Sequence, residues 1–172
     1  MKKLLLLLSI VSMSALASPL DNLSVYGGLG FGGKLKSSET SNADNATINL
    51  GTRYLFTINE SFSVGPFVDY MSKTEYDSIS HTILSGGVSG KYQHKSGVYG
   101  LASIGLNSVD LTPSSFKTDN KSTIIGTIGY AINPNISVEG SYAISSFKVK
   151  QGDGTKVDVD TSTFSLAAVY NF

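Results

Sequence analysis

Phe164-Ser-Leu-Ala-Ala-Val-Tyr-Asn-Phe172 stands at the end of the sequence, and its alternation decides the fold class. Every second residue from Phe164 to Phe172 is apolar or aromatic, whereas the residues between them are mostly small or polar. A period of two predicts a β-strand with chemically different faces. A final Phe suits a lipid-facing strand that stops at a membrane interface. The alternative is an edge strand of a soluble β-sandwich, and the rest of the chain must separate the two.

The first residues have the pattern of a secretory signal. Lys2 and Lys3 precede an apolar run that begins at Leu4, and Ala15-Leu16-Ala17 provides a small-x-small cleavage site. We therefore expect a signal peptide over 1–17, cleaved after Ala17, and one domain over 18–172. The apolar run is too short to span a bilayer, so the pattern predicts export without anchoring.

Composition narrows the class of protein further. Without Lys2 and Lys3, 13 − 2 = 11 basic residues face 13 acidic ones, which gives a net charge of −2. There is no basic excess that would favour nucleic acid. The lack of cysteine excludes disulfides, thiolate nucleophiles and cysteine-ligated metals. Because no later segment approaches the ~20 apolar residues of a spanning helix, a membrane location requires a closed β-barrel.

After the expected signal, the alternation recurs along eight segments. Each is close to the ~9–11 residues that a tilted strand needs to cross a bilayer. They cover about 23–34, 47–57, 61–71, 81–93, 97–107, 122–132, 136–146 and 159–172.

The connections between these segments alternate in length. Short turns lie at 58–60, 94–96 and 133–135, whereas longer polar stretches lie at 36–46, 72–80, 108–121 and 147–158. A Greek-key sandwich would not sort its loops in this way. We predict an all-β fold, an eight-stranded antiparallel up-and-down transmembrane β-barrel with short periplasmic turns and longer extracellular loops.

Outward aromatic residues of the predicted strands form two groups, one near each end of the barrel. The group near the short turns is Phe56, Phe62, Tyr92, Tyr130, Tyr170 and Phe172, and the group nearer the long loops is Phe31, Tyr70 and Tyr142. Two aromatic girdles are typical of a barrel that crosses a membrane. In a soluble fold the same rings would form an unexplained exposed patch.

Charged residues at inward positions predict a network inside the barrel. These residues are Lys34, Arg53, Asp69, Lys91 and Glu139. Buried charges persist when they are paired or hydrated, and Arg53 and Glu139 lie at similar depth on strands that face each other. Because an eight-stranded barrel is just wide enough for side chains to fill, we expect these charges, with inward Tyr26, Phe67 and Tyr99, to plug the lumen. The alternative is an ion-conducting path.

Motifs that could carry catalysis are weak. Gly28-Leu-Gly-Phe-Gly-Gly33 matches G-x-G-x-x-G, but no helical period follows, so small residues in a crowded lumen explain it better than a dinucleotide site. His94 falls in a short turn, and His81 is expected near a solvated rim. Ser80 and His81 are adjacent on a strand, so they should point to opposite faces and not form a nucleophile–base pair. We predict no enzyme, no cofactor and no metal site.

The long loops allow two interpretations. They are polar and carry isolated aromatic residues at Tyr76, Phe116 and Phe147, and the fourth loop mixes charges: Lys148, Lys150 and Lys156 with Asp153, Asp158 and Asp160. The first interpretation is a solvated surface in contact with lipopolysaccharide phosphates. The second is a recognition surface, since binding residues concentrate on loops held by a rigid scaffold.

Three stretches resemble a known family. Asn49-Leu50 followed by Arg53-Tyr54 is similar to the second strand of small eight-stranded outer-membrane proteins of the OmpX/Ail type, with Gly51 and Leu55 in place of its Lys and Glu. Ser137 to Tyr142, with inward Glu139, resembles its seventh strand. Val169-Tyr-Asn-Phe172 is similar to its closing strand, with Asn in place of Arg.

The resemblance covers 18–172 as an architecture, and it implies several expectations. Tyr170 and Phe172 would serve as an assembly signal, read by the barrel-assembly machinery with periplasmic chaperones. The protein would be a monomer in the outer membrane of a Gram-negative bacterium, surrounded by lipid and lipopolysaccharide. The family's functions in adhesion, serum resistance and host-cell contact would depend on the loops and on a host or surface ligand.

Three functions therefore compete. The favoured one is an integral barrel with a plugged lumen that acts structurally or through its extracellular loops in adhesion. A narrow pore for ions or small solutes is the alternative. A lipid-modifying enzyme of the outer leaflet is the least favoured, because strand parity does not bring Ser, His and an acid together.

Overall fold

The computed structural model describes residues 22–36, 40–42, 46–76, 79–112, 117–150 and 156–172. The expected signal peptide lies outside this part of the chain. The described residues form ten strands: β1 (Leu23–Lys36), β2 (Thr40–Asn42), β3 (Thr47–Tyr54), β4 (Phe56–Asn59), β5 (Phe62–Tyr76), β6 (Ile79–Gln93), β7 (Val98–Thr112), β8 (Lys117–Ala131), β9 (Ile136–Lys150) and β10 (Lys156–Asn171). No helix in this part of the chain is long and apolar enough to cross a membrane.

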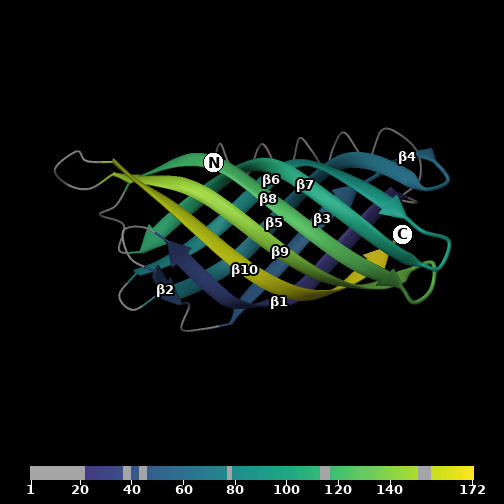
Figure 1. Cartoon of the computed structure of the whole chain (residues 1–172), viewed down its shortest axis with the longest axis horizontal. Helices are drawn as coiled ribbons and strands as arrows, with labels where there is room; N and C mark the ends of the chain where they lie inside the picture. Colours follow the sequence, from purple (N-terminus) through teal and green to yellow (C-terminus); the bar gives the residue numbers. More distant parts are fainter. Residues whose placement is uncertain (1–21, 37–39, 43–45, 77–78, 113–116, 151–155) are drawn as a thin grey trace.

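The strands close into one antiparallel barrel. Neighbours in sequence pair from β5 to β10, β3 joins β1 to β5, and β10 returns to pair with β1. Because β4 continues the line of β3 along β5, and β2 only pairs with the far end of β1, the wall has the eight predicted strands. The end of β10 and the short turns lie at one end of the barrel, and β2 lies at the other (Figure 1).

Alternation places apolar side chains outside and polar ones inside. All nine predicted girdle residues are exposed on the exterior, from Phe62 at 39% to Tyr92 at 58%. Leu106 and Ile128 between the girdles are 73% and 72% exposed. Inside, buried Ser and Thr residues predominate. A soluble protein places its apolar side chains inside and its polar ones outside. The reverse arrangement seen here is typical of a barrel whose exterior faces lipid.

The strands extend further than predicted beyond the outer girdle, which is the aromatic group nearer the long loops. β5 continues to Tyr76, β7 to Thr112 and β9 to Lys150, so most of the predicted long-loop residues belong to strands. The prediction ended each strand where outward residues became polar. Above the membrane the outer face meets water, and polar outward residues there are compatible with continued pairing.

Two irregularities change the wall locally. The second wall strand breaks at Leu55, between Arg53, which pairs with Phe67, and Phe56, which pairs with Val64. The break faces the neighbourhood of Pro66, which has no N–H for a ladder. A bulge in β1 sets Phe31 against Phe164 but Lys34 against Ser162, so three steps along β1 match two along β10.

Candidate functional site: the barrel lumen

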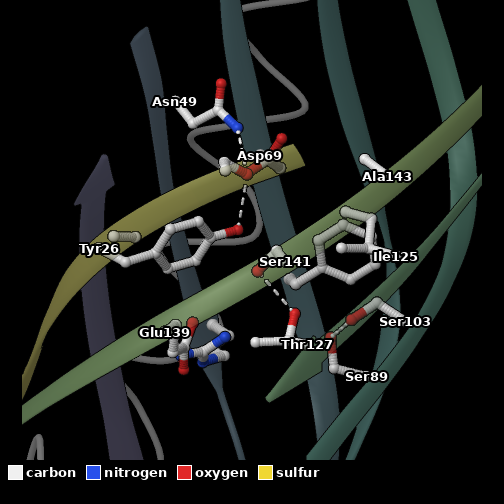
Figure 2. A pocket seen from close by; sticks show the side chains of 14 residues that line it. Tyr26, Asn49, Asp69, Ser89, Ser103, Ile125, Thr127, Glu139, Ser141 and Ala143 are labelled. Atoms are coloured by element: carbon white, nitrogen blue, oxygen red, sulfur yellow. Dashed lines mark hydrogen bonds and ion pairs between the residues drawn. The ribbon is translucent and has the colours of Figure 1, made fainter. Parts of the chain in front are cut away.

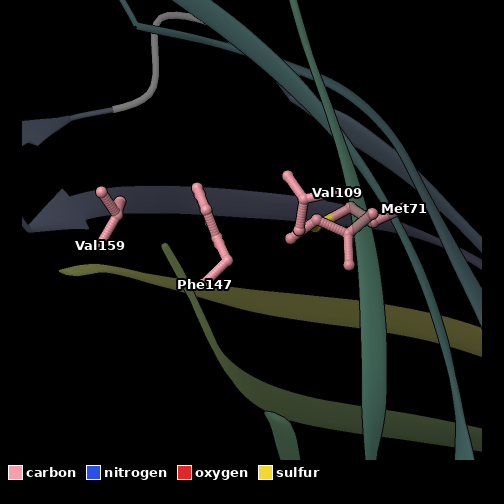
Figure 3. Close-up of a cluster of buried hydrophobic side chains, with 5 residues drawn as sticks. Met71, Val109, Phe147 and Val159 are labelled. Carbon is pink, nitrogen blue, oxygen red and sulfur yellow. The ribbon is translucent and has the colours of Figure 1, made fainter. Parts of the chain in front are cut away.

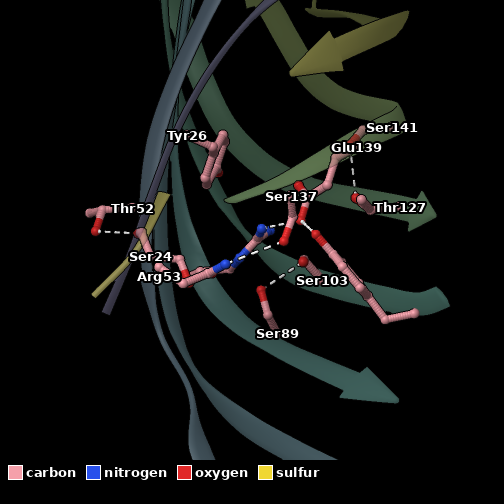
Figure 4. Close-up of polar contacts among 12 residues, drawn as sticks. Ser24, Tyr26, Thr52, Arg53, Ser89, Ser103, Thr127, Ser137, Glu139 and Ser141 are labelled. Carbon is pink, nitrogen blue, oxygen red and sulfur yellow. Dashed lines mark hydrogen bonds and ion pairs between the residues drawn. The ribbon is translucent and has the colours of Figure 1, made fainter. Parts of the chain in front are cut away.

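Two buried charges form the centre of the lumen. The Arg53 guanidinium on β3 pairs with the Glu139 carboxylate on β9, and their side chains are only 8% and 2% exposed (Figure 4). Tyr99 on β7 donates its hydroxyl to the same Glu139 oxygen at 2.7 Å. Lys91 Nζ lies 4.2 Å from the centroid of the Tyr99 ring, and the Arg53 guanidinium carbon lies 5.0 Å from that of Tyr26. The two cations are thus held by a carboxylate and by aromatic faces.

A second carboxylate lies nearer the long-loop end. Tyr26 on β1 donates its hydroxyl to Asp69 on β5 at 2.9 Å (Figure 2). Over the inner face of β1, Asn49 Nδ2 on β3 donates to Ser165 Oγ on β10 at 3.0 Å. These groups border a cavity of about 30 Å³, which is large enough for ordered water.

Hydroxyl pairs tie neighbouring strands together on the inner face. Their members are direct register partners, with oxygen separations of 2.7 Å, 2.9 Å and 2.7 Å: Ser89–Ser103, Thr127–Ser141 and Thr123–Ser145. Since each hydroxyl can donate and accept, such pairs satisfy buried polar groups without a charge.

Apolar side chains form two buried clusters inside the barrel. Near the short turns, Leu55, Tyr99 and Leu101 form a buried cluster. Beyond the outer girdle a larger cluster fills the lumen, and its members come from five strands (Figure 3): Met71, Ile83, Val109, Phe147 and Val159. Among the described residues, the polar interior is therefore closed by apolar side chains at its long-loop end, and the smaller cluster lies beside Tyr99 in the charged centre.

Four of the five charges predicted for the lumen point inward. Arg53, Asp69, Lys91 and Glu139 make the contacts above, two cations against two anions. The prediction for Lys34 was wrong, because the bulge in β1 shifts strand parity and leaves this side chain exposed on the outside.

The two histidines lie in different parts of the barrel. His94 lies in a short turn, exposed, with its Nδ1 2.9 Å from Ser96 Oγ. His81 was predicted at a solvated rim, but it is only 1% exposed and lies inside the barrel, with its ring centroid 6.1 Å from that of Phe147. No cluster of three or more metal-binding side chains occurs among the described residues.

The outer apolar closure was missed in the sequence. Phe147 was interpreted as an isolated loop aromatic, whereas it lies on β9 with no exposed surface. Phe116, interpreted in the same way, lies outside the described residues. A signal did exist, because apolar residues continue at every second position over Phe147–Val149 and Val157–Val159. It was overlooked because the outward positions there had already become polar.

Fold and site together define an integral outer-membrane β-barrel of eight wall strands with a filled lumen. The chain belongs to the family described as outer membrane protein beta-barrel domain, which matches residues 4–172. No curated protein sequence matches it. The predicted class of protein, including the likeness to OmpX/Ail-type barrels, is confirmed, and the family is one of Gram-negative outer membranes.

Solved structures share the fold at low sequence identity. Neisserial surface protein A matches with a TM-score of 0.63 and 19% identity, covering 88% of this chain and 97% of that chain. Ail, the attachment invasion locus protein of Yersinia pestis, matches at 0.53 and 19%, covering 87% and 97%. The outer membrane protease OmpT of Escherichia coli matches at 0.50 and 9%, covering 88% and 97%. Identities this low show the common fold and no shared activity.

Proposed function

We propose that this barrel acts through the extracellular end of its strands and loops, in attachment to a host or surface ligand, and that its filled lumen has a structural role. The observation that carries the proposal is the contrast between the two regions. The lumen is occupied by paired polar groups and apolar clusters, whereas the strands beyond the outer girdle present charged side chains to the outside. Binding residues on a rigid barrel are expected at that end.

The charged exterior of β8 to β10 supports this role. Asp119 on β8 accepts hydrogen bonds from Lys150 on β9 and Lys156 on β10, both at 3.1 Å, and these bonds lower the pKa of its carboxyl below the usual value. Lys148 Nζ lies 3.8 Å from an Asp158 oxygen. These side chains are 38–64% exposed, so a partner could contact them directly. The name of Ail, which has the same fold, refers to attachment.

The test is whole-cell binding to immobilised matrix proteins and serum factors. Cells that express the protein should bind more than cells without it, and replacement of Lys148, Lys150 and Lys156 by Gln, or deletion of 151–155, should reduce binding. A matched control, Ser89→Ala in the lumen, should leave binding unchanged. Equal binding with and without the protein at matched surface levels would contradict the proposal.

A narrow pore remains the second candidate, favoured by the cavity beside Arg53 and Asp69. Single-channel recordings in planar bilayers separate the two, because a filled lumen should give no steady conductance. An enzyme has less support, since His81 and His94 lie toward opposite ends of β6.

The proposal also includes the partners of biogenesis. We infer that a signal peptide over 1–17 is removed on export, and that chaperones and the barrel-assembly machinery deliver the chain as a monomer into lipid and lipopolysaccharide. Mass spectrometry of the mature protein checks the cleavage after Ala17.

A further inference from the structure

One carboxylate in the lumen has no cationic partner. Asp69 accepts the Tyr26 hydroxyl at 2.9 Å, and it makes no ion pair within the described part of the chain. The Arg53 guanidinium is bound instead to Glu139. A carboxylate inside a barrel is stable only when a positive charge, a proton or water compensates its lost hydration. One hydroxyl donor does not supply that compensation, so Asp69 needs a further partner.

The cavity beside Asp69 is lined by oxygen atoms from most of the barrel wall. Besides Asp69, it is bordered by the amide of Asn49 and by five hydroxyl groups (Figure 2): Ser89, Ser103, Thr127, Ser141 and Ser165. These hydroxyls are hydrogen-bonded to one another or to Asn49 at 2.7–3.0 Å. Because a hydroxyl oxygen has two lone pairs, each can still offer one to a further partner. Apolar side chains complete the lining.

The charges that border this cavity do not balance. Arg53 contributes one positive charge, whereas Asp69 and Glu139 contribute one negative charge each, which leaves a net charge of −1. The second cation of the lumen, Lys91, is not part of the lining, and its Nζ lies 4.2 Å from the centroid of the Tyr99 ring. One additional positive charge would therefore make the surroundings of the cavity neutral, whereas a divalent ion would reverse their charge.

We propose that this cavity binds one alkali cation, Na⁺ or K⁺, with Asp69 as its charged ligand and neutral oxygen atoms of Asn49 and the hydroxyls as its other ligands. Oxygen atoms are the donors that hard cations prefer. An unhydrated alkali cation is comparable in size to a water molecule, for which the cavity of about 30 Å³ is large enough. The site needs no continuous path through the barrel, and it does not depend on the proposed role in attachment.

The experiment measures whether folding is linked to alkali cations. The mature chain is refolded into phosphatidylcholine vesicles, so that the ion can enter before the lumen closes. Urea unfolding is then compared in NaCl, KCl and choline chloride at equal ionic strength, since choline is a monovalent cation too bulky for this cavity. A ligand that binds only the folded state raises the folding equilibrium constant by up to about tenfold for each tenfold rise in its concentration. We expect this rise when Na⁺, K⁺ or both replace choline.

The charged ligand is tested by Asp69→Asn, which removes the charge and keeps the shape of the side chain. This variant should unfold at the same urea concentration in all three salts. The matched control, Glu60→Gln, removes a carboxylate from an exposed short turn and should keep the difference between alkali and choline salts. Equal wild-type midpoints in the three salts would overturn the proposal, because a proton or water would then compensate Asp69. A salt difference that persists in Asp69→Asn would also overturn it.

Two serines of β9 provide a second test, which does not require Asp69→Asn to fold. Ser141 borders the cavity and is hydrogen-bonded to Thr127 at 2.9 Å, whereas Ser137 lies outside the lining and accepts a bond from Asn171 at 3.2 Å. Ser141→Ala should raise the cation concentration needed for a given stabilisation, and Ser137→Ala should leave it at the wild-type value. An equal cation dependence of the two serine variants would overturn the assignment of the site to this cavity.

Discussion

At the scale of single residues, two tyrosines in the lumen depend on the glycines opposite them. Tyr26 pairs with Gly51 across β1 and β3, and Tyr99 pairs with Gly129 across β7 and β8. A Cβ atom at either glycine would overlap the tyrosine ring. The missing side chains therefore let both rings lie along the wall with their hydroxyls directed at Asp69 and Glu139.

We expect Gly129→Ala to destabilise the barrel by about 1–3 kcal/mol, because the added methyl group must displace Tyr99 from Glu139. Gly126→Ala is the matched control, since no atom lies within 4 Å of an added Cβ there. Urea unfolding in lipid vesicles measures both. Equal stability of the two variants would show that Tyr99 is free to shift.

The Arg53–Glu139 pair gives a second prediction at this scale. Replacing either residue alone by Met leaves an uncompensated charge and should cost about 3–5 kcal/mol. Replacing both should cost less than the sum of the single changes, because no unpaired charge remains. A double-mutant cycle on urea unfolding tests this. Additive effects would show that the two are uncoupled, and a marked rise in conductance of the double variant would show that the pair blocks a path.

At the scale of elements, the sequence predicts the strands better than their ends. All eight wall strands and the three short turns follow from alternation, since within the bilayer each face meets a different medium. Phe147 was misplaced because beyond the outer girdle the outer face meets water and its apolar signal disappears, whereas Lys34 was misplaced because of the bulge in β1. The bulges after Phe31 and Met71 do not show in the period-two pattern of the sequence. The sequence therefore could not predict which side chains point inward beyond these bulges.

The end of β10 gives the prediction for this scale. The Phe172 N–H donates to the Leu23 carbonyl at 3.0 Å, and its ring packs edge-on against Tyr170 at 4.9 Å, where β10 closes the barrel on β1. Deletion of Phe172, or Phe172→Glu, should reduce assembly in the outer membrane, whereas Phe172→Leu should retain more of it. Protease shaving of intact cells measures the surface level, and an unchanged level after deletion would contradict the expectation.

At the scale of the whole molecule, the sequence also predicts that the lumen is filled, and it predicts part of how the lumen is filled. The pairing of Arg53 with Glu139 across the barrel follows from two features of the sequence. Both residues fall on the inward face of their strands, and both lie at a similar distance from the short turns. The apolar cluster beyond the outer girdle does not follow, because its members lie where the outward positions have already become polar and the pattern no longer marks a strand.

The exterior of the molecule determines the medium in which it can fold. Leu106, Ile128 and Ile104 are 73%, 72% and 63% exposed, and side chains of this kind cover the band between the girdles. In water this surface would drive association, so we expect the mature chain to fold only with an amphiphile present. In detergent it should give a β-type circular dichroism spectrum and migrate differently on gels with and without heating. A folded, monodisperse protein in plain buffer would contradict the membrane assignment. An exterior covered by these apolar side chains is stable against lipid but would associate in water.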